Sequence, residues 1–319
     1  MADAYSLSVR ESAALTRRVT GLSVATALVL TALKAAVWLA SGSVSILASL
    51  ADSGLDLVAA IGTFAAVRVA ATPPDSEHRF GHGKAEAFAS LVQAGLVFAS
   101  AALIGQQAII RLLHPQPIAQ SLWAIAAMAL STVLTVMLIA AQTRVLRRTR
   151  SIAVTGDRAH YLADLASNLM ALVAIAAAGL FGFGGFDALG GLAVAAVLLW
   201  GAIGVFREAS GELMDRELPN AARARIVALM TEDPRLTGVH QLRTRAAGPT
   251  VHMQMHADLD PELSLEAAHE VVVAAEKRVL EAFPSADIII HADPRGRAEP
   301  HGGAFPEPGD APAAPARSV

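Results

Sequence analysis

The chain has 319 residues, of which 54% are hydrophobic and 17% are charged. Its mean hydropathy of +0.48 exceeds the usual balance of a soluble domain and argues against a soluble single-domain enzyme. The formal net charge of -3 excludes an overall basic surface for nucleic acid, and the absence of cysteine excludes disulfides and thiolate metal sites. Any metal must therefore be held by oxygen atoms or by the ten histidines.

A polar lead-in over residues 1–18 lacks the apolar core of a secretory signal and precedes six predicted membrane spans. A bilayer core of about 30 Å needs roughly 20 mostly apolar residues per helix. The last four spans contain long uncharged stretches, whereas Lys34 interrupts the first span and two aspartates interrupt the second. We therefore predict a six-helix transmembrane domain over 19–206, with spans near residues 19–41, 46–70, 88–110, 119–142, 160–181 and 187–206.

The connections between these spans differ in positive charge. Lys and Arg are frequent in the lead-in, around the second connection and in the fourth, and at most one occurs in each of the others. Because positively charged connections stay on the cytosolic side of a membrane, this alternation predicts an even number of spans with both termini in the cytosol. We expect a multi-pass protein of the cytoplasmic (inner) membrane.

The sequence becomes mixed and charged over residues 207–293, which predicts a small cytosolic domain. A first helix is expected to begin with Asn220 as its cap. The segment 250–259 alternates apolar and polar residues, as a half-buried strand does, and 239–245 pairs with it as a hairpin.

A second helix is expected from Ser264 to Phe283, followed by a last strand over 286–291. The order αββαβ predicts an open α+β sandwich. Residues 294–319 are rich in Pro, Ala and Gly, and we expect this tail to be disordered.

Two pairs of ionisable residues lie inside the apolar spans. Asp52 and Asp56 are four residues apart, and so are His160 and Asp164, so that each pair shares one helical face. Carboxylates inside a membrane are costly and mark cavities or cation sites. Brought face to face, the two helices would offer three carboxylates and one imidazole, a donor set that suits a tetrahedral divalent ion.

Each pair alone also has a structural explanation. Asp52 is a candidate helix cap or partner of Lys34, and His160 is a candidate for a neutral histidine bonded to a carbonyl. Asp157 shares the face of His160 and Asp164, and both a capping role and a place in the ion path stay open for it. Lys34 is interpreted as a charge-balancing residue that snorkels, not as a ligand.

The sequence resembles the cation diffusion facilitator family over residues 10 to 295. ADSGLD at 51–56 looks like the family's second-span DxxxD, and HYLAD at 160–164 looks like its fifth-span HxxxD. HRFGHGKAE at 78–86 is similar to the signature before the third span, above all in the bacterial ferrous-iron and zinc efflux branch. GVHQLRTRAAGPT and DIIIHADP in the C-terminal part resemble that branch as well.

The resemblance implies six membrane helices, a cytosolic metal-binding domain, a homodimer and three metal sites. It implies a transport site of Asp52, Asp56, His160 and Asp164, a loop site of Asp75, His78 and His82, and a two-metal cytosolic site of His240, His256, His269, His291 and Asp293. It also implies a salt bridge between Lys84 and Asp215. Taken alone, the loop and C-terminal histidines are weak metal signals. His252 is left out of the implied ligand set, although it shares the strand face of His256.

We expect a divalent cation/proton antiporter that exports zinc, with iron(II) and cadmium as further candidates for its cargo. Its partners are then divalent ions, protons, membrane lipid and a second copy of the chain, without nucleic acid. The alternatives are a metal-sensing membrane scaffold and a proton-coupled carrier of small solutes. No nucleophile and base pairing, phosphate loop or HExxH motif occurs in the sequence, so we do not expect an enzyme.

Overall fold

The computed structural model describes residues 6–41, 44–114, 122–181 and 185–296. The chain divides into two compact units, which we describe separately. The membrane unit comprises Val9–Met214, and the C-terminal unit comprises Met1–Ser8 with Asp215–Val319. Most of the tail that the sequence predicts to be disordered, residues 297–319, lies outside the described residues.

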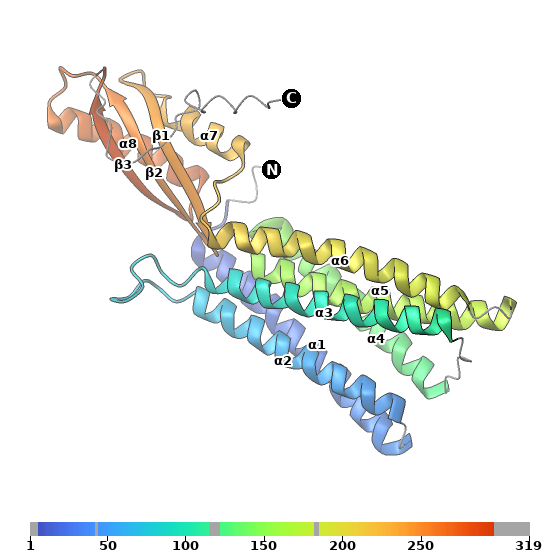
Figure 1. Cartoon of the computed structure of the whole chain (residues 1–319). Coiled ribbons are helices and arrows are strands. Elements are labelled where there is room, and N and C mark those ends of the chain that lie inside the picture. Colours follow the sequence, from blue (N-terminus) through green and yellow to red (C-terminus); the bar gives the residue numbers. More distant parts are fainter. Residues whose placement is uncertain (1–5, 42–43, 115–121, 182–184, 297–319) are drawn as a thin grey trace, which may run out of the picture. The chain divides into compact units, whose positions relative to one another are not determined.

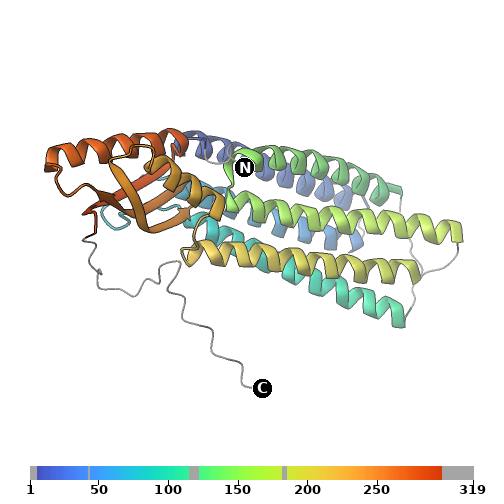
Figure 2. The same cartoon turned by 90° about the horizontal axis from the view of Figure 1, so that it is seen from above.

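The described part of the membrane unit forms six long helices (Figure 1). In chain order they are α1 (Val9–Ser41), α2 (Val44–Ala70), α3 (Ala85–Leu113), α4 (Leu122–Thr149), α5 (Ile152–Phe181) and α6 (Gly185–Leu213). Two helix pairs pack most extensively, α1 with α2 and α3 with α6 (Figure 2), and α5 also packs against α3, α4 and α6. The α5 helix is therefore in contact with most of the bundle.

Large apolar side chains point out of this bundle. Leu28, Leu55, Phe88 and Trp200 are exposed, whereas small and polar residues fill much of the interior. This distribution suits lipid and not water, because a bilayer is as apolar as the exposed side chains. Among the described residues, five helices are long and apolar enough to cross a membrane, namely α1, α2, α3, α4 and α6.

The first half of the α5 helix carries four ionisable residues, namely Asp157, Arg158, His160 and Asp164. It approaches α3 closely at Gly156, where an added Cβ would lie 2.7 Å from Oγ of Ser90 and 2.9 Å from its Cα. Glycine is therefore required here for the two helices to meet, as is common between membrane helices.

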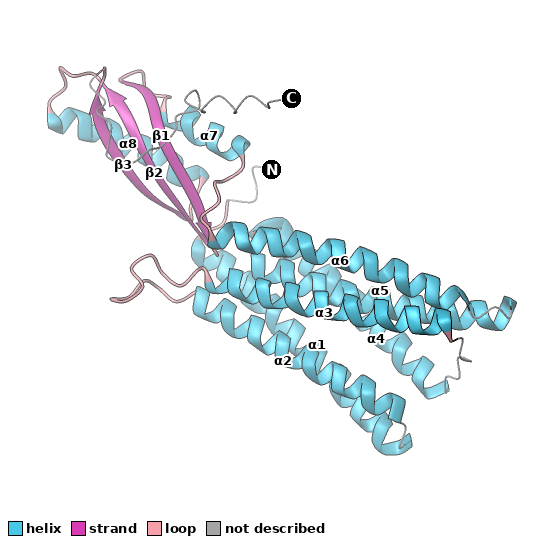
Figure 3. Cartoon of the chain, in the orientation of Figure 1, coloured by secondary structure: helices cyan, strands magenta, loops and turns pink. Residues whose placement is uncertain are grey.

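The C-terminal unit contains a three-stranded sheet and two helices (Figure 3). Its elements are α7 (Asn220–Met230), β1 (Leu236–Ala247), β2 (Thr250–Leu259), α8 (Leu265–Ala282) and β3 (Ala286–Pro294). The β1 and β2 strands pair antiparallel, and β3 joins β2 in parallel after the α8 crossover. The predicted helical bundle followed by an αββαβ domain is confirmed.

The predicted alternation of the segment 250–259 is confirmed in β2. Met253 and Met255 are fully buried and pack with Val271 of α8 and with Phe283. The hydroxyl of Ser264 accepts a hydrogen bond from the backbone N–H of Ala267 at 3.2 Å, so Ser264 caps α8, which begins one residue later than predicted, at Leu265. The opposite face of β2 carries the polar side chains.

The expectation that Asn220 caps α7 is wrong. The helix already includes Asn220, and Pro219 is the cap residue. The carbonyl of Pro219 accepts hydrogen bonds from the backbone N–H groups of Ala222 and Arg223 at 2.8 and 3.2 Å. A helix can begin this way without a side-chain cap, because the proline carbonyl supplies the first acceptor.

Candidate metal-binding sites

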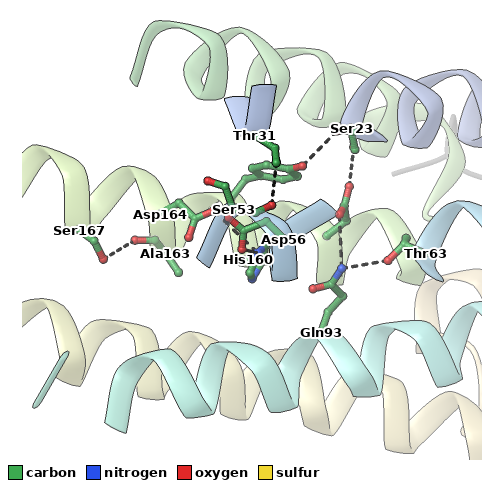
Figure 4. Close-up of polar contacts among 12 residues, drawn as sticks. Ser23, Thr31, Ser53, Asp56, Thr63, Gln93, His160, Ala163, Asp164 and Ser167 are labelled. Carbon is green, nitrogen blue, oxygen red and sulfur yellow. Dashed lines mark hydrogen bonds and ion pairs between the residues drawn. The ribbon is translucent and has the colours of Figure 1, made fainter. Parts of the chain in front are cut away.

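The α2 and α5 helices bring Asp56, His160 and Asp164 together (Figure 4). Nε2 of His160 lies 2.9 Å from Oδ1 of Asp56 and 3.8 Å from Oδ2 of Asp164. One ligand atom from each residue falls within 4.8 Å of the others, which is close enough for one metal ion. The i, i+4 spacing on α5 places the side chains of His160 and Asp164 on the face that meets α2.

This cluster, which we call the membrane site, is shielded from solvent. The side chains of His160, Asp56 and Asp164 are 6%, 18% and 29% exposed. Two carboxylates and an imidazole at such depth are costly unless they pair or hold a cation. Nδ1 of His160 is buried without a hydrogen-bond partner among the residues that the structure describes.

Asp52, the fourth residue that the resemblance implies, lies outside this group of three. It is exposed and stands one turn before Asp56 on α2. Lys34 of α1 lies nearby, and its Nζ donates to Oγ of Ser53 at 2.5 Å and to the carbonyl of Ser49 at 3.3 Å. This lysine thus holds α1 against α2 beside Asp52, and the role of Asp52 as a ligand stays a prediction.

The connection between α2 and α3 gathers the residues of the predicted loop site. Nε2 of His82 lies 3.3 Å from Oδ2 of Asp75, and Nδ1 of His78 lies 3.6 Å from Oδ1 of the same carboxylate. The two imidazole rings are 4.6 Å apart. All three residues offer ligand atoms within 4.8 Å of one another.

The Asp75 carboxylate is held by its own loop. The backbone N–H groups of His78 and Glu77 donate to Oδ1 at 2.7 and 2.9 Å. The bond from His78 is the main reason that the pKa of Asp75 is lowered from its usual value. The carboxylate is therefore ionised, and available to a cation, throughout the neutral range.

The C-terminal site is built by strand register. His240 of β1 is the partner of His256 in β2, which is in turn the partner of His291 in β3. Asp293 of β3 is the partner of Asp258 in strand register. It is 5% exposed and lies among the three imidazoles. Its oxygens are 3.3 Å from Nε2 of His240, 2.8 Å from Nδ1 of His256 and 3.1 Å from Nε2 of His291.

Asp258 is a residue of this site that the sequence analysis missed. Its Oδ1 lies 3.5 Å from Nε2 of His240. The alternation of β2 contained the signal, because Asp258 is two residues after His256 and shares its face. Gly238 leaves room for it, since a Cβ at that position would be 2.7 Å from Oδ2 of Asp258.

Two further histidines lie elsewhere in the C-terminal unit. His269 is exposed on α8 and is not part of the three-residue metal group that the described residues form here. Nδ1 of His252 lies 3.0 Å from Oδ2 of Asp287, its partner in strand register, so this residue belongs to a separate pair. The role of His269 as a further ligand stays a prediction.

The predicted salt bridge between Lys84 and Asp215 joins residues of the two separately described units. Within its own unit, Nζ of Lys84 donates to the carbonyl of Leu213 at 3.2 Å. Oδ2 of Asp215 accepts from Nη1 of Arg245 at 3.1 Å. The bridge itself stays a prediction.

Comparisons with known proteins agree with this division of the chain. The model of the cation efflux transmembrane domain matches residues 21–214, and that of the cation efflux protein cytoplasmic domain matches residues 218–295. The cation-efflux pump FieF of Shewanella oneidensis is 41% identical over 272 residues, which are 85% of this chain and 92% of that protein. FieF of Salmonella arizonae is 38% identical over 270 residues, with 85% and 90% covered.

A solved structure of CzrB in its Zn form matches a smaller part of the chain. It is 32% identical in sequence and covers 27% of this chain and 100% of its own, with a TM-score of 0.25. The transmembrane match includes the membrane site and the loop site, and the cytoplasmic match includes the histidine cluster of the sheet.

Proposed function

The chain belongs to the cation diffusion facilitator family of cation efflux transporters, and from that premise we propose that it exports zinc from the cytosol in exchange for protons. The observation that carries the proposal is the membrane site, where Asp56, His160 and Asp164 converge inside an apolar helix bundle. Divalent cation efflux by a multi-pass membrane protein follows from the family. The identity of the cargo, the antiport and the direction are our proposal.

Proton exchange follows from the chemistry of the membrane site. A metal ion needs ionised carboxylates and a neutral imidazole, so loading from the cytosol releases protons and protonation from the other side expels the metal. Nε2 of His160 already contacts Oδ1 of Asp56 at 2.9 Å, so a proton shared by these two atoms must leave when a metal enters. Metal and proton therefore compete for the same atoms.

The ligand set favours zinc over hard cations. One imidazole nitrogen with carboxylate oxygens suits a tetrahedral zinc ion, and iron(II) and cadmium accept the same donors. Magnesium and calcium prefer six or more oxygen ligands. Asp52, one turn before Asp56, is our candidate for the fourth ligand.

We assign a regulatory role to the C-terminal site. Zinc would be held there by His240, His256, His291 and Asp293, and His269 would complete the coordination of a second zinc ion. The domain would pair with the same domain of a second copy of the chain. Three strands hold these side chains in fixed register, which suits a site that stays loaded. The loop site of Asp75, His78 and His82 would bind cytosolic metal outside the membrane.

The arrangement in the membrane is part of the same proposal. The Lys and Arg distribution supports cytosolic N- and C-termini and a location in the cytoplasmic membrane. Metal then enters the membrane site from the side that carries the C-terminal unit.

Zinc uptake into proteoliposomes against an imposed pH gradient tests this proposal. We expect uptake that depends on the gradient for the wild type and background uptake for Asp164→Ala, because that variant lacks one of the three converging ligands. Iron(II), cadmium and manganese are measured in parallel to rank the cargo. Zinc uptake that does not respond to the pH gradient would contradict antiport, and equal uptake by Asp164→Ala would contradict the assigned site.

A further inference from the structure

Asp157 is the most deeply buried carboxylate of α5 and takes no part in the three metal groups described above. It is 1% exposed. The helix begins at Ile152, and Oγ of Ser151 accepts from the backbone N–H of Val154 at 3.4 Å, so the start of α5 has its own cap. Asp157 therefore lies inside the helix, and the capping role left open by the sequence is wrong.

Side chains from three other helices donate to this one carboxylate. Oγ of Ser23 on α1 donates to Oδ2 at 2.6 Å, and Nε2 of Gln142 on α4 donates to the same oxygen at 2.9 Å. Nε2 of Gln93 on α3 lies 3.5 Å from Oδ1. Asp157 thus ties α5 to α1, α3 and α4.

The network extends to a fifth helix. Nε2 of Gln93 also donates to Oγ1 of Thr63 on α2 at 2.9 Å, a contact visible in Figure 4. The hydroxyl of Tyr161, on α5, donates to the backbone carbonyl of Ser23 at 3.2 Å and adds a second bond to α1. The donors Ser23, Gln93 and Gln142 are themselves buried.

The partners of Asp157 match a carboxylate and not an amide. A carboxylate only accepts hydrogen bonds, and all three groups that face it here are donors. An asparagine of the same size would keep one acceptor oxygen and replace the other with an NH2 group, so Ser23, Gln93 and Gln142 could no longer all donate to residue 157. Both oxygens of Asp157 are engaged, whereas Oε1 of Gln93 and Oε1 of Gln142 are buried without a partner among the described residues. Losing the carboxylate would therefore add to the unsatisfied polar groups of a buried network.

The position of Asp157 connects this network to the membrane site. Asp157, His160 and Asp164 stand at i, i+3 and i+7 on one face of α5, so the network fixes the rotation of the helix one turn from the first ligand. Metal sites need their ligands within about 0.5 Å of the productive geometry. A small rotation of α5 would carry His160 and Asp164 away from Asp56 on α2.

We propose that Asp157 is a positioning residue, which fixes α5 against α1, α3 and α4 so that His160 and Asp164 meet Asp56 at metal-binding distance. The inference rests on the proposed transport role of the membrane site. Asp157 itself does not touch the metal. Its removal loosens the site and lowers both its affinity and its discrimination between metals of different size.

Zinc and cadmium transport by the full-length chain in proteoliposomes tests this inference. We expect Asp157→Asn to raise the KM for zinc by about tenfold to hundredfold, the range seen when groups that orient metal ligands are lost. The zinc-to-cadmium ratio of kcat/KM should move toward one, and kcat should change much less than KM. Ser23→Ala removes a single donor and should raise the KM by a smaller factor, about threefold.

A reciprocal exchange of donor and acceptor provides the control. Asp157→Asn combined with Gln142→Glu restores a donor and a carboxylate on the same two helices. We therefore expect the KM for zinc and the zinc-to-cadmium ratio of kcat/KM to return most of the way to the wild-type values. If Asp157→Asn alone fails to fold, the KM and the metal ratio of the exchange variant and of Ser23→Ala test the inference in its place. An unchanged KM and metal ratio in every folded single variant, or no recovery in a folded exchange variant, would overturn the inference. Absence of zinc transport by the wild type would instead refute the proposed function.

Discussion

The membrane site and the C-terminal site use similar ligands but are assembled in different ways. In the sheet, backbone register sets His240, His256 and His291 side by side on three strands. In the membrane unit, Asp56 of α2 meets His160 and Asp164 of α5, and side-chain hydrogen bonds join α5 to its neighbouring helices. In the proposed transport cycle the site between helices opens and closes, as alternating access requires, and the backbone-built site keeps its geometry.

The largest effect should come from removing a ligand of the membrane site. We expect Asp56→Ala to lower zinc flux by at least about a hundredfold, because the variant leaves His160 without the carboxylate at 2.9 Å. Zinc binding at the C-terminal site should stay intact. Flux measurements and equilibrium zinc binding on the same full-length preparation check the lower flux and the intact C-terminal binding. Loss of C-terminal binding together with flux would show that the two sites are not independent.

A change in the C-terminal site should have the opposite pattern. Asp293→Asn removes a charge from the carboxylate that contacts all three imidazoles, and zinc affinity there should fall about tenfold to hundredfold. Flux should decrease by a smaller factor, since the membrane site is untouched. Zinc titration of the full-length variant measures the first effect and proteoliposome flux the second. Complete loss of flux would make the C-terminal site essential instead of regulatory.

The close contact of α5 with α3 gives a third prediction. Gly156→Ala should destabilise the bundle by about 1–3 kcal/mol, the usual cost of overpacking, because the new Cβ meets Ser90 at 2.7 Å. Gly95→Ala on α3 is the matched control, since nothing lies within 4 Å of an added Cβ there. Thermal unfolding of the two variants in detergent compares them. Equal melting temperatures would mean that α3 and α5 can separate without cost.

A smaller effect is expected at Asp258, the residue that the structure adds to the C-terminal site. Asp258→Asn should weaken zinc binding at the C-terminal site by about threefold, because its oxygen is 3.5 Å from His240 and farther than those of Asp293. Titration of the variant against the wild type measures the difference. A loss as large as that of Asp293→Asn would make Asp258 a direct ligand.

The smallest effect concerns the loop site and pH. The pKa of Asp75 is lowered mainly by the backbone N–H of His78, so this bond stabilises the loop above the usual carboxyl pKa and is lost only as pH falls through the lowered value. Between pH 7 and pH 5 the loop turn should therefore keep its structure. Amide exchange of His78 and Glu77, expressed as protection relative to the intrinsic exchange rate at each pH, measures this, and lower protection at pH 5 would contradict the assignment.

The sequence predicts the helices and the strand face well because each follows from a local property of the chain. The apolar spans require length alone, and the alternation from Val251 to Ala257 requires only a period of two. The pairs at i, i+4 likewise predict that His160 and Asp164 share a face. These are local properties, and the structure agrees with them except at helix ends, since α1 begins at Val9 inside the predicted lead-in and α6 continues to Leu213, past the predicted end at residue 206.

Contacts between helices are harder to predict. Nothing in the spacing of Ser23, Gln93 and Gln142 indicates that they meet at Asp157, because that depends on how four helices pack. Asp258 was missed for a similar reason, since its approach to His240 depends on strand register and on Gly238. The start of α7 at Asn220 also differed from expectation, because Pro219 provides the first acceptor through its backbone.

The most direct test of the account is a structure of the full-length chain with zinc, with the metal located by its anomalous scattering. We expect a peak in the membrane unit within bonding distance of Oδ1 of Asp56, Nε2 of His160 and Oδ2 of Asp164, and no such peak in Asp164→Ala. Zinc only in the loop and the sheet, with none between α2 and α5, would contradict it.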